Sequence, residues 1–291
     1  MDTQEILKRV RKIEIKTRGL SNQLFSGEYH SAFKGRGMAF SEVREYQLGD
    51  EIRSIDWNVT ARLNHPYIKV FEEERELTVM LLIDVSKSES FGTREQLKRQ
   101  LITEVSAVLA FSAIQNNDKI GVVFFSDQVE KFIPPKKGRS HILRIIRELI
   151  DFEPEHGETN LSEALKFINS AIKKRSIVFL LSDFIDDNFQ NALKIANKKH
   201  DLVALHVRDR QEEKLPNIGL APLQDPESGK TQWVDTSSKR IREEYEKQRK
   251  IAVLKLQDMF TRSGVDTASL YTGESYTKPL MNLFKQRELR R

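Results

Sequence analysis

Short oxygen-bearing side chains follow two apolar, strand-length segments of the sequence and also occupy a polar loop between them. The segment at residues 77–84 leads into the run Asp-Val-Ser-Lys-Ser, and the segment at 176–182 is followed by an aspartate. The loop at 155–160 carries a threonine directly before a predicted helix. Oxygen ligands with few charges suit a hard cation, Mg2+ above all, or Mn2+ in its place. The candidate metal ligands are Asp84, Ser86, Ser88, Thr159 and Asp183.

Each of these residues also has an ordinary structural role open to it. Serine and aspartate after a strand are common turn residues, and Thr159 could cap the helix that begins at residue 160 or 161. The order of all five along an alternating pattern of strands and helices favours the metal site. In open parallel sheets, ligands bind beyond the carboxyl ends of the strands, where the strand order reverses.

The elements that would position these residues lie between residues 76 and 272. Apolar runs such as 79–83 and 177–181 show no alternation, which indicates strands buried on both faces of a parallel sheet. Strands are predicted at 77–84, 120–126, 129–133, 176–182, 202–207 and 265–271. Helices are predicted at 94–116, 139–151, 161–174, 189–199 and 238–263. We therefore predict an α/β fold, a doubly wound and mostly parallel sheet of the Rossmann type.

Two further segments flank this predicted domain, which divides the chain into residues 1–75, 76–272 and 273–291. The first contains a predicted helix at 2–17 and a β-rich extension with strands near 38–46 and 67–74. Within the extension we expect a structural turn with ion pairs and one buried indole, formed by Asp50, Arg53, Asp56, Trp57 and Arg62. The last segment combines a helix at 277–286 with a basic tail, and residues 211–235 form an excursion at the sheet edge.

The composition limits the compartment and the partners. The 291 residues include 48 Lys and Arg against 43 Asp and Glu, and the two signs are interleaved along most of the chain, which disfavours nucleic acid as a partner. The absence of cysteine excludes disulfide scaffolds, thiolate zinc sites and cysteine nucleophiles. No apolar run reaches the roughly 20 residues of a membrane-spanning helix. We expect a cytoplasmic protein.

Two resemblances sharpen these expectations. The D-x-S-x-S run, the later threonine and the later aspartate resemble the metal-ion-dependent adhesion site of von Willebrand factor A domains. A second set of residues is similar to the bacterial "domain of unknown function 58" proteins, which are von Willebrand factor A-like and are usually encoded beside MoxR-type AAA+ ATPases. That set is Arg44-Glu-Tyr46, Gly49-Asp50, Arg53, Ile55-Asp-Trp57 and Ala61-Arg62. The resemblance implies a MoxR-type ATPase and a client protein that presents a carboxylate as partners.

The predicted function is therefore metal-dependent recognition of another protein, and not catalysis. The spacing of Gly229-Lys-Thr231 does not fit a phosphate-binding loop, because Gln224 stands where that motif needs glycine. The alternative is a Mg2+-dependent phosphoryl hydrolase that uses Asp84, Asp183 and Glu158. A third hypothesis, which we rank below both, is nucleic-acid binding through the basic tail with Lys34 and Arg36.

Overall fold

The computed structural model describes residues 37–74, 77–86, 98–155, 157–186, 188–224 and 231–290. Ser88 and the predicted helix at 2–17 lie outside the described residues. By its internal contacts the chain forms two compact units, one of Phe33–Leu77 and one that contains Thr78–Arg291. None of the helices in the described part of the chain combines the length and the apolar character needed to cross a lipid bilayer.

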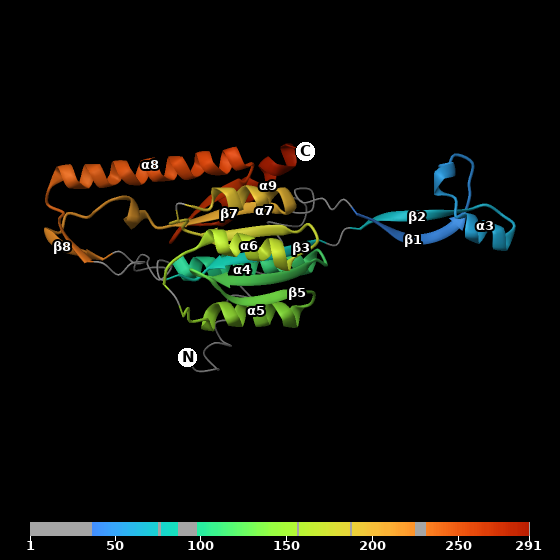
Figure 1. Ribbon diagram of the computed structural model, residues 1–291, viewed down its shortest axis with the longest axis horizontal. Coiled ribbons are helices and arrows are strands. Elements are labelled where there is room, and N and C mark those ends of the chain that lie inside the picture. Colours follow the sequence, from blue (N-terminus) through green and yellow to red (C-terminus); the bar gives the residue numbers. More distant parts are fainter. Residues whose placement is uncertain are drawn as a thin grey trace. The chain divides into compact units, whose positions relative to one another are not determined.

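The smaller unit is built on one antiparallel strand pair, β1 (Gly37–Glu45) with β2 (Tyr67–Glu74) (Figure 1). The short helices η1 (Ile52–Ser54) and α3 (Trp57–Leu63) lie between these strands in sequence. Asp56 caps α3 by accepting from the backbone N–H groups of Asn58 and Val59, at 3.0 and 3.4 Å.

Both aspartates of the predicted turn form ion pairs, but with Arg44 and Lys69, which lie outside the predicted set, and the predicted buried indole is exposed. Arg44 donates both terminal nitrogens to the carboxylate of Asp50, at 2.8 and 2.7 Å, and Lys69 lies 3.4 Å from Asp56. The side chain of Trp57 is 67% exposed, so the expectation of burial is wrong. Its position explains the error: Trp57 is the first residue of a seven-residue helix that buries none of its side chains.

The larger unit has a six-stranded central sheet in the order β10-β7-β6-β3-β4-β5. Five strands are parallel, and the edge strand β5 runs antiparallel to β4. The strands are β3 (Thr78–Asp84), β4 (Lys119–Phe125), β5 (Val129–Lys136), β6 (Ile177–Ser182), β7 (Asp201–Arg208) and β10 (Asp266–Tyr271). The prediction of a doubly wound, mostly parallel α/β sheet is confirmed.

Helices cover both faces of this sheet, which is why its central strands read as unbroken apolar runs (Figure 1). One face packs Met80, Leu82 and Val178 against α6, α7 and α8. The opposite face packs α9, because the rings of Phe179 and Phe284 meet edge to face at 6.4 Å. The helices are α4 (Lys98–Gln115), α5 (Arg139–Asp151), α6 (Leu161–Ala171), α7 (Gln190–Lys199), α8 (Lys239–Ser263) and α9 (Thr277–Leu289).

The segment between β7 and α8 leaves the sheet, as its composition predicts. It forms the short helix η3 (Arg210–Glu213) and a two-stranded hairpin, β8 (Leu220–Gln224) with β9 (Thr231–Asp235). The chain then returns along α8, which ends where Gly264 takes the left-handed conformation and donates its N–H to the carbonyls of the last turn.

The strand order fixes where a ligand site can form. From β3 the chain crosses to β4 on one side, and it returns later to β6 on the other side of β3. The order therefore reverses between β3 and β6, and the loops that follow these two strands diverge at their carboxyl ends. Asp84 ends β3 and Asp183 follows β6, so the topology brings these two carboxylates to the reversal point.

A buried histidine makes the stability of the larger unit sensitive to acid. His200, at the end of α7, is fully buried, and neither ring nitrogen has a hydrogen-bond partner in the part of the chain that the structure describes. Burial, and then the charges of Lys199 and Arg175, lowers the pKa of His200 from 6.5 to about 4. Above pH 6.5 the ring is neutral in both the folded and the unfolded states. Between pH 6.5 and 4 the ring is protonated in the unfolded chain but stays neutral in the folded chain.

We predict that His200 lowers the free energy of unfolding by up to about 1.4 kcal/mol for each pH unit between pH 6.5 and 4. Urea unfolding at pH 7, 6 and 5 measures this dependence for the parent and for His200→Leu, in which it should be flatter. The exposed His65 gives the matched control His65→Leu, which should keep the slope of the parent. Equal slopes in all three proteins would contradict the assignment.

Candidate functional site

Asp84 is the centre of a buried hydrogen-bond network at the end of β3. The residue is 1% exposed. Its Oδ1 accepts from the backbone N–H of Ser86 at 3.0 Å, and its Oδ2 accepts from the hydroxyl of Ser182 at 2.6 Å. The Ser182 hydroxyl also accepts from the N–H of Phe184 at 2.9 Å. The ends of β3 and β6 are thus connected through side-chain oxygens.

Asp183, one residue beyond β6, is paired with a buried lysine. The ammonium of Lys98, at the start of α4, lies 2.9 Å from Asp183 Oδ2 and 2.6 Å from Glu212 Oε1 of η3. The Lys98 side chain is 1% exposed and that of Asp183 is 3% exposed, so little solvent screens their attraction. One ammonium therefore bridges the carboxyl edge of the sheet and the segment that leads to the hairpin.

The two aspartates create an excess of negative charge in this site. Burial, and then the charge of Asp183, raises the pKa of Asp84 from 3.8 to about 7. The hydrogen bonds from Ser182 and Ser86 act in the opposite direction, because they stabilise the carboxylate, but they do not cancel the effect of burial. A further positive charge near Asp84 would favour its ionised form.

Thr159 presents a buried oxygen that no described protein group uses. Its Oγ1 is inaccessible to solvent and has no hydrogen-bond partner among the described residues. The helix-capping role that the sequence left open belongs instead to its neighbour, because the side chain of Asn160 accepts from the N–H of Glu163 at 3.0 Å. Thr159 is thereby left free of the cap.

The structure connects three of the five predicted ligands directly, and Ser88 lies outside the described residues. Asp84 accepts from Ser86, and the charge of Asp183 adds to burial in raising the pKa of Asp84. Thr159 and Asp183 both line a cavity of about 760 Å³. In the part of the chain that is described, no three His, Asp or Glu side chains are arranged to hold a metal. A cation here would therefore depend on hydroxyl oxygens as well as the two carboxylates.

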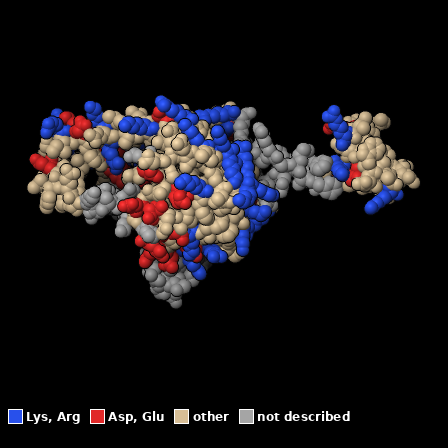
Figure 2. Space-filling view, viewed as in Figure 1, with Lys and Arg blue, Asp and Glu red and all other residues tan. Residues whose placement is uncertain are grey.

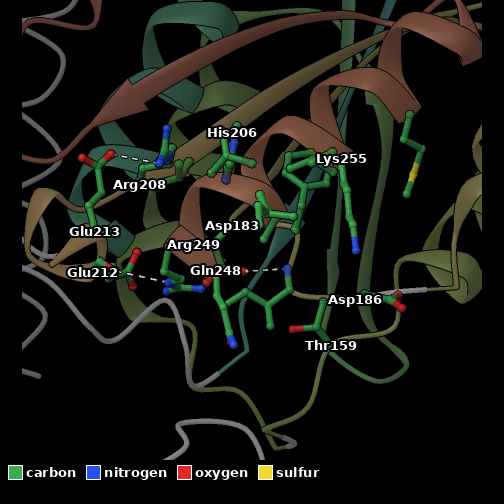
Figure 3. Close-up of a pocket in the computed structure, with 18 of the residues that line it drawn as sticks. Thr159, Asp183, Asp186, His206, Arg208, Glu212, Glu213, Gln248, Arg249 and Lys255 are labelled. Atoms are coloured by element: carbon green, nitrogen blue, oxygen red, sulfur yellow. Dashed lines mark hydrogen bonds and ion pairs between the residues drawn. The ribbon is translucent and has the colours of Figure 1, made fainter. Parts of the chain in front are cut away.

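The large cavity lies between the carboxyl edge of the sheet and α8 (Figure 3). His206 of β7 lies in its wall, where burial, and then the charge of Arg208, lowers its pKa to about 3 and keeps its ring neutral. The acidic residues that line the cavity include Glu212 and Glu213 of η3. Glu158, the third residue of the hydrolase alternative, is exposed and does not line this cavity.

Sequence reasoning missed the lysine and the glutamate of this site. Lys98 had a readable signal, since it falls in the predicted helix at 94–116 and shares a helical stripe with the buried Leu101, Ile102 and Val105. A lysine in such a stripe needs an acidic partner, because an unpaired buried ammonium is costly. Glu212 had no comparable signal, because it lies 114 residues further along the chain in an irregular segment.

The sheet topology and the oxygen-rich edge define a doubly wound, mostly parallel α/β protein. The chain belongs to the family described as "Protein of unknown function DUF58", whose profile matches residues 42–252.

Similar proteins are found among curated sequences and solved structures. The uncharacterized protein Rv1480 of Mycobacterium tuberculosis is 28% identical over 232 residues, which cover 79% of this chain and 73% of that protein. The crystal structure of the conserved hypothetical protein BatB from Bacteroides thetaiotaomicron is 14% identical, with a TM-score of 0.48, and covers 72% of this chain and 98% of that one. The SpRpn10 VWA domain is 12% identical, with a TM-score of 0.40, and covers 72% and 95% of the two chains.

We predict that Lys98→Met destabilises the larger unit by about 3–5 kcal/mol without divalent cations, because it leaves the buried carboxylate of Asp183 without its ammonium. Urea unfolding in EDTA measures the loss. The same substitution at the exposed Lys166, whose ion pair with Glu163 spans 3.7 Å, should cost less than about 1 kcal/mol. The double variant Lys98→Met/Asp183→Asn should lose less than the sum of its single changes. Equal losses in Lys98→Met and Lys166→Met would show that the pair is not structural.

Proposed function

We propose that this protein is a protein-interaction module whose contact with a partner depends on Mg2+ or Mn2+ at the carboxyl edge of its sheet. The observation that carries the proposal is the pair of buried aspartates, together with a buried hydroxyl that lines the same cavity as Asp183. Burial, and then the charge of Asp183, raises the pKa of Asp84, and Thr159 Oγ1 has no hydrogen-bond partner among the described residues. A site short of positive charge, with a free oxygen ligand, is chemically suited to a hard cation.

At such a site, different residues of this chain would supply different kinds of oxygen ligand. Asp84 and Asp183 would supply carboxylate oxygens, directly or through water, and Ser86, Ser88 and Thr159 would supply hydroxyls. When bound, the cation would provide an electropositive, open coordination position that a carboxylate of another protein can fill. The hydrogen bonds of Asp84 to Ser86 and Ser182 hold its carboxylate in one orientation before any ligand arrives.

We infer that the partners are a MoxR-type AAA+ ATPase and a client protein that presents a carboxylate. The support is the family to which residues 42–252 belong, together with the resemblance of the segment 44–62 to proteins encoded beside such ATPases. Binding rather than catalysis is proposed because Asp84 and Asp183 are buried and held by Ser182 and Lys98, so neither carboxylate is free to act as an exposed base.

Metal binding should be visible as a gain in thermal stability. A cation at ten times its dissociation constant stabilises the folded state by about 1.4 kcal/mol, or about 3–6 °C in melting temperature for a unit of this size. We predict this rise with Mg2+ or Mn2+ for the parent and a smaller one for Thr159→Val. Thr267→Val, at an exposed position of β10, is the matched control and should respond like the parent. An undiminished rise in the double variant Asp84→Ala/Asp183→Ala would place the bound cation elsewhere.

The partner contact should depend on the same oxygen ligand. Removal of one ligand interaction costs about 1–3 kcal/mol, which is about ten- to a hundredfold in affinity. We therefore expect Thr159→Val to weaken binding of the cognate MoxR-type ATPase, or of its client, by that factor in Mg2+. Titrations of the parent and Thr159→Val, each in Mg2+ and in EDTA, measure it. Equal affinity in all four titrations would refute a metal-dependent contact.

A further inference from the structure

Exposed positive charge gathers at the amino edge of the central sheet, the end at which its parallel strands begin. The loop after α6 leads into β6 and α7 leads into β7, so this loop and the end of α7 lie at the amino edge. Figure 2 shows Lys and Arg side chains concentrated on this end of the larger unit. We refer to the exposed cations of these two segments as the basic face: Lys173, Lys174, Arg175, Lys194 and Lys198.

The basic face has no acidic counterpart among the described residues. Between residues 164 and 200 the described carboxylates are those of Asp183 and Asp186, which belong to the carboxyl edge. Asp201 and Asp266, which begin β7 and β10 at the amino edge, share the guanidinium of Arg287, at 2.5 and 2.8 Å. No cation of the basic face forms an ion pair with a carboxylate in the described part of the chain.

The helices that pack against α7 also leave this charge uncompensated. They are α6 and α8. On α6, Glu163 lies 3.7 Å from Lys166, and on α8 the last acid, Asp258, lies 2.9 Å from Arg262. Each of these acids thus has a cation on its own helix. A ligand at the basic face therefore meets an excess of positive charge that remains when the neighbouring acids are counted.

The side chains of the basic face favour a membrane surface over nucleic acid. Most of its cations are lysines, whose ammonium is a point charge on a flexible stem and needs no bidentate partner at a fixed position. Ile195, which is 62% exposed, lies beside Lys194 and Lys198 on the outer side of α7. No aromatic side chain of residues 164–200 is exposed, so nucleic-acid bases would have no ring to stack on.

We propose that the basic face binds the anionic headgroups of a phospholipid membrane, with the lysine ammonium groups on phosphates and Ile195 at the boundary of the acyl chains. Charge complementarity identifies the occupant, because clusters of roughly four to eight such cations are attracted to anionic lipid. The proposal is independent of the proposed function, since none of the candidate metal ligands belongs to the basic face.

Binding through the basic face would orient the larger unit on the membrane. Asp84 and Asp183 lie at the carboxyl edge of the sheet, and Asp186 and Glu212 line the cavity there. An anionic surface attracts the amino edge and repels this acidic edge. The candidate site would therefore face away from the lipid and stay open to a partner protein.

Co-sedimentation of the full-length protein with lipid vesicles tests the proposal. Vesicles of phosphatidylcholine with about one third phosphatidylglycerol should bind the parent in about 0.1 M NaCl and release it in about 0.5 M, because salt screens the attraction. Vesicles of phosphatidylcholine alone should not bind it. Equal binding to the two kinds of vesicle, or no binding to the anionic ones, would overturn the proposal.

Charge reversal on α7 assigns the binding to the basic face. Lys194→Glu/Lys198→Glu should weaken the affinity for anionic vesicles by about ten- to a hundredfold, because two attractive charges become repulsive. Arg240→Glu/Lys247→Glu, at exposed positions of α8, is the matched control; it changes the net charge equally and should bind like the parent. Equal affinities of the α7 variant and the parent would contradict the assignment.

A second variant makes the result independent of the fold of α7. Lys173→Glu/Lys174→Glu changes only the loop after α6 and should weaken vesicle binding by a similar factor. Circular dichroism checks that both variants keep the helix content of the parent. Full binding by a folded loop variant would overturn the extent of the face.

Two further measurements separate this contact from nucleic acid and from the candidate metal site. A fluorescein-labelled DNA duplex is titrated in the same buffer, and tighter binding to the duplex than to the vesicles, per mole of phosphate, would overturn the choice of lipid. Vesicle binding should persist in EDTA, because the basic face needs no metal. Loss of vesicle binding in EDTA would refute the basic face, whereas loss of partner binding alone would concern only the proposed function.

Discussion

The ammonium of Lys98 is the interaction on which the arrangement of the candidate site depends. It lies within 2.9 Å of Asp183 and 2.6 Å of Glu212, with almost no access to solvent. Without it, the buried carboxylate of Asp183 and the partly buried carboxylate of Glu212 would lack this cation at the carboxyl edge of the sheet, near the buried Asp84. A charged pair of this kind costs free energy to desolvate, and it is tolerated only because each partner satisfies the other. It therefore fixes the position of α4 relative to β6 and η3 more than it adds to stability.

The consequences of this ion pair extend to α8. Glu212 contacts Lys98 through its side chain, and its carbonyl accepts from Tyr245 and Arg249 of α8, at 3.0 and 3.2 Å. The part of the cavity wall formed by α8 is thus connected, through Glu212 and Lys98, to the aspartate that follows β6. Lys98 therefore acts both on Asp183 and on the residue that anchors α8.

Much of the scaffold could be predicted because its signals are local. The amphipathic pattern of residues 139–151 gives α5 with the bounds observed, and the unbroken apolar run at 79–83 gives a strand buried on both faces. Strand β5 extends three residues beyond its predicted end at 133, through Pro134 and Pro135. Proline is acceptable there because β5 is an edge strand, with no neighbour on its outer side to receive a backbone hydrogen bond.

The site was predictable only in part, because some of its residues are placed by the strand order and others by contacts between distant segments. Asp84 and Asp183 follow from topology alone, since Asp84 ends β3 and Asp183 follows β6, the two strands that flank the reversal of strand order. The contact of Lys98 with Glu212 joins positions 114 residues apart, and no periodicity encodes such a pairing.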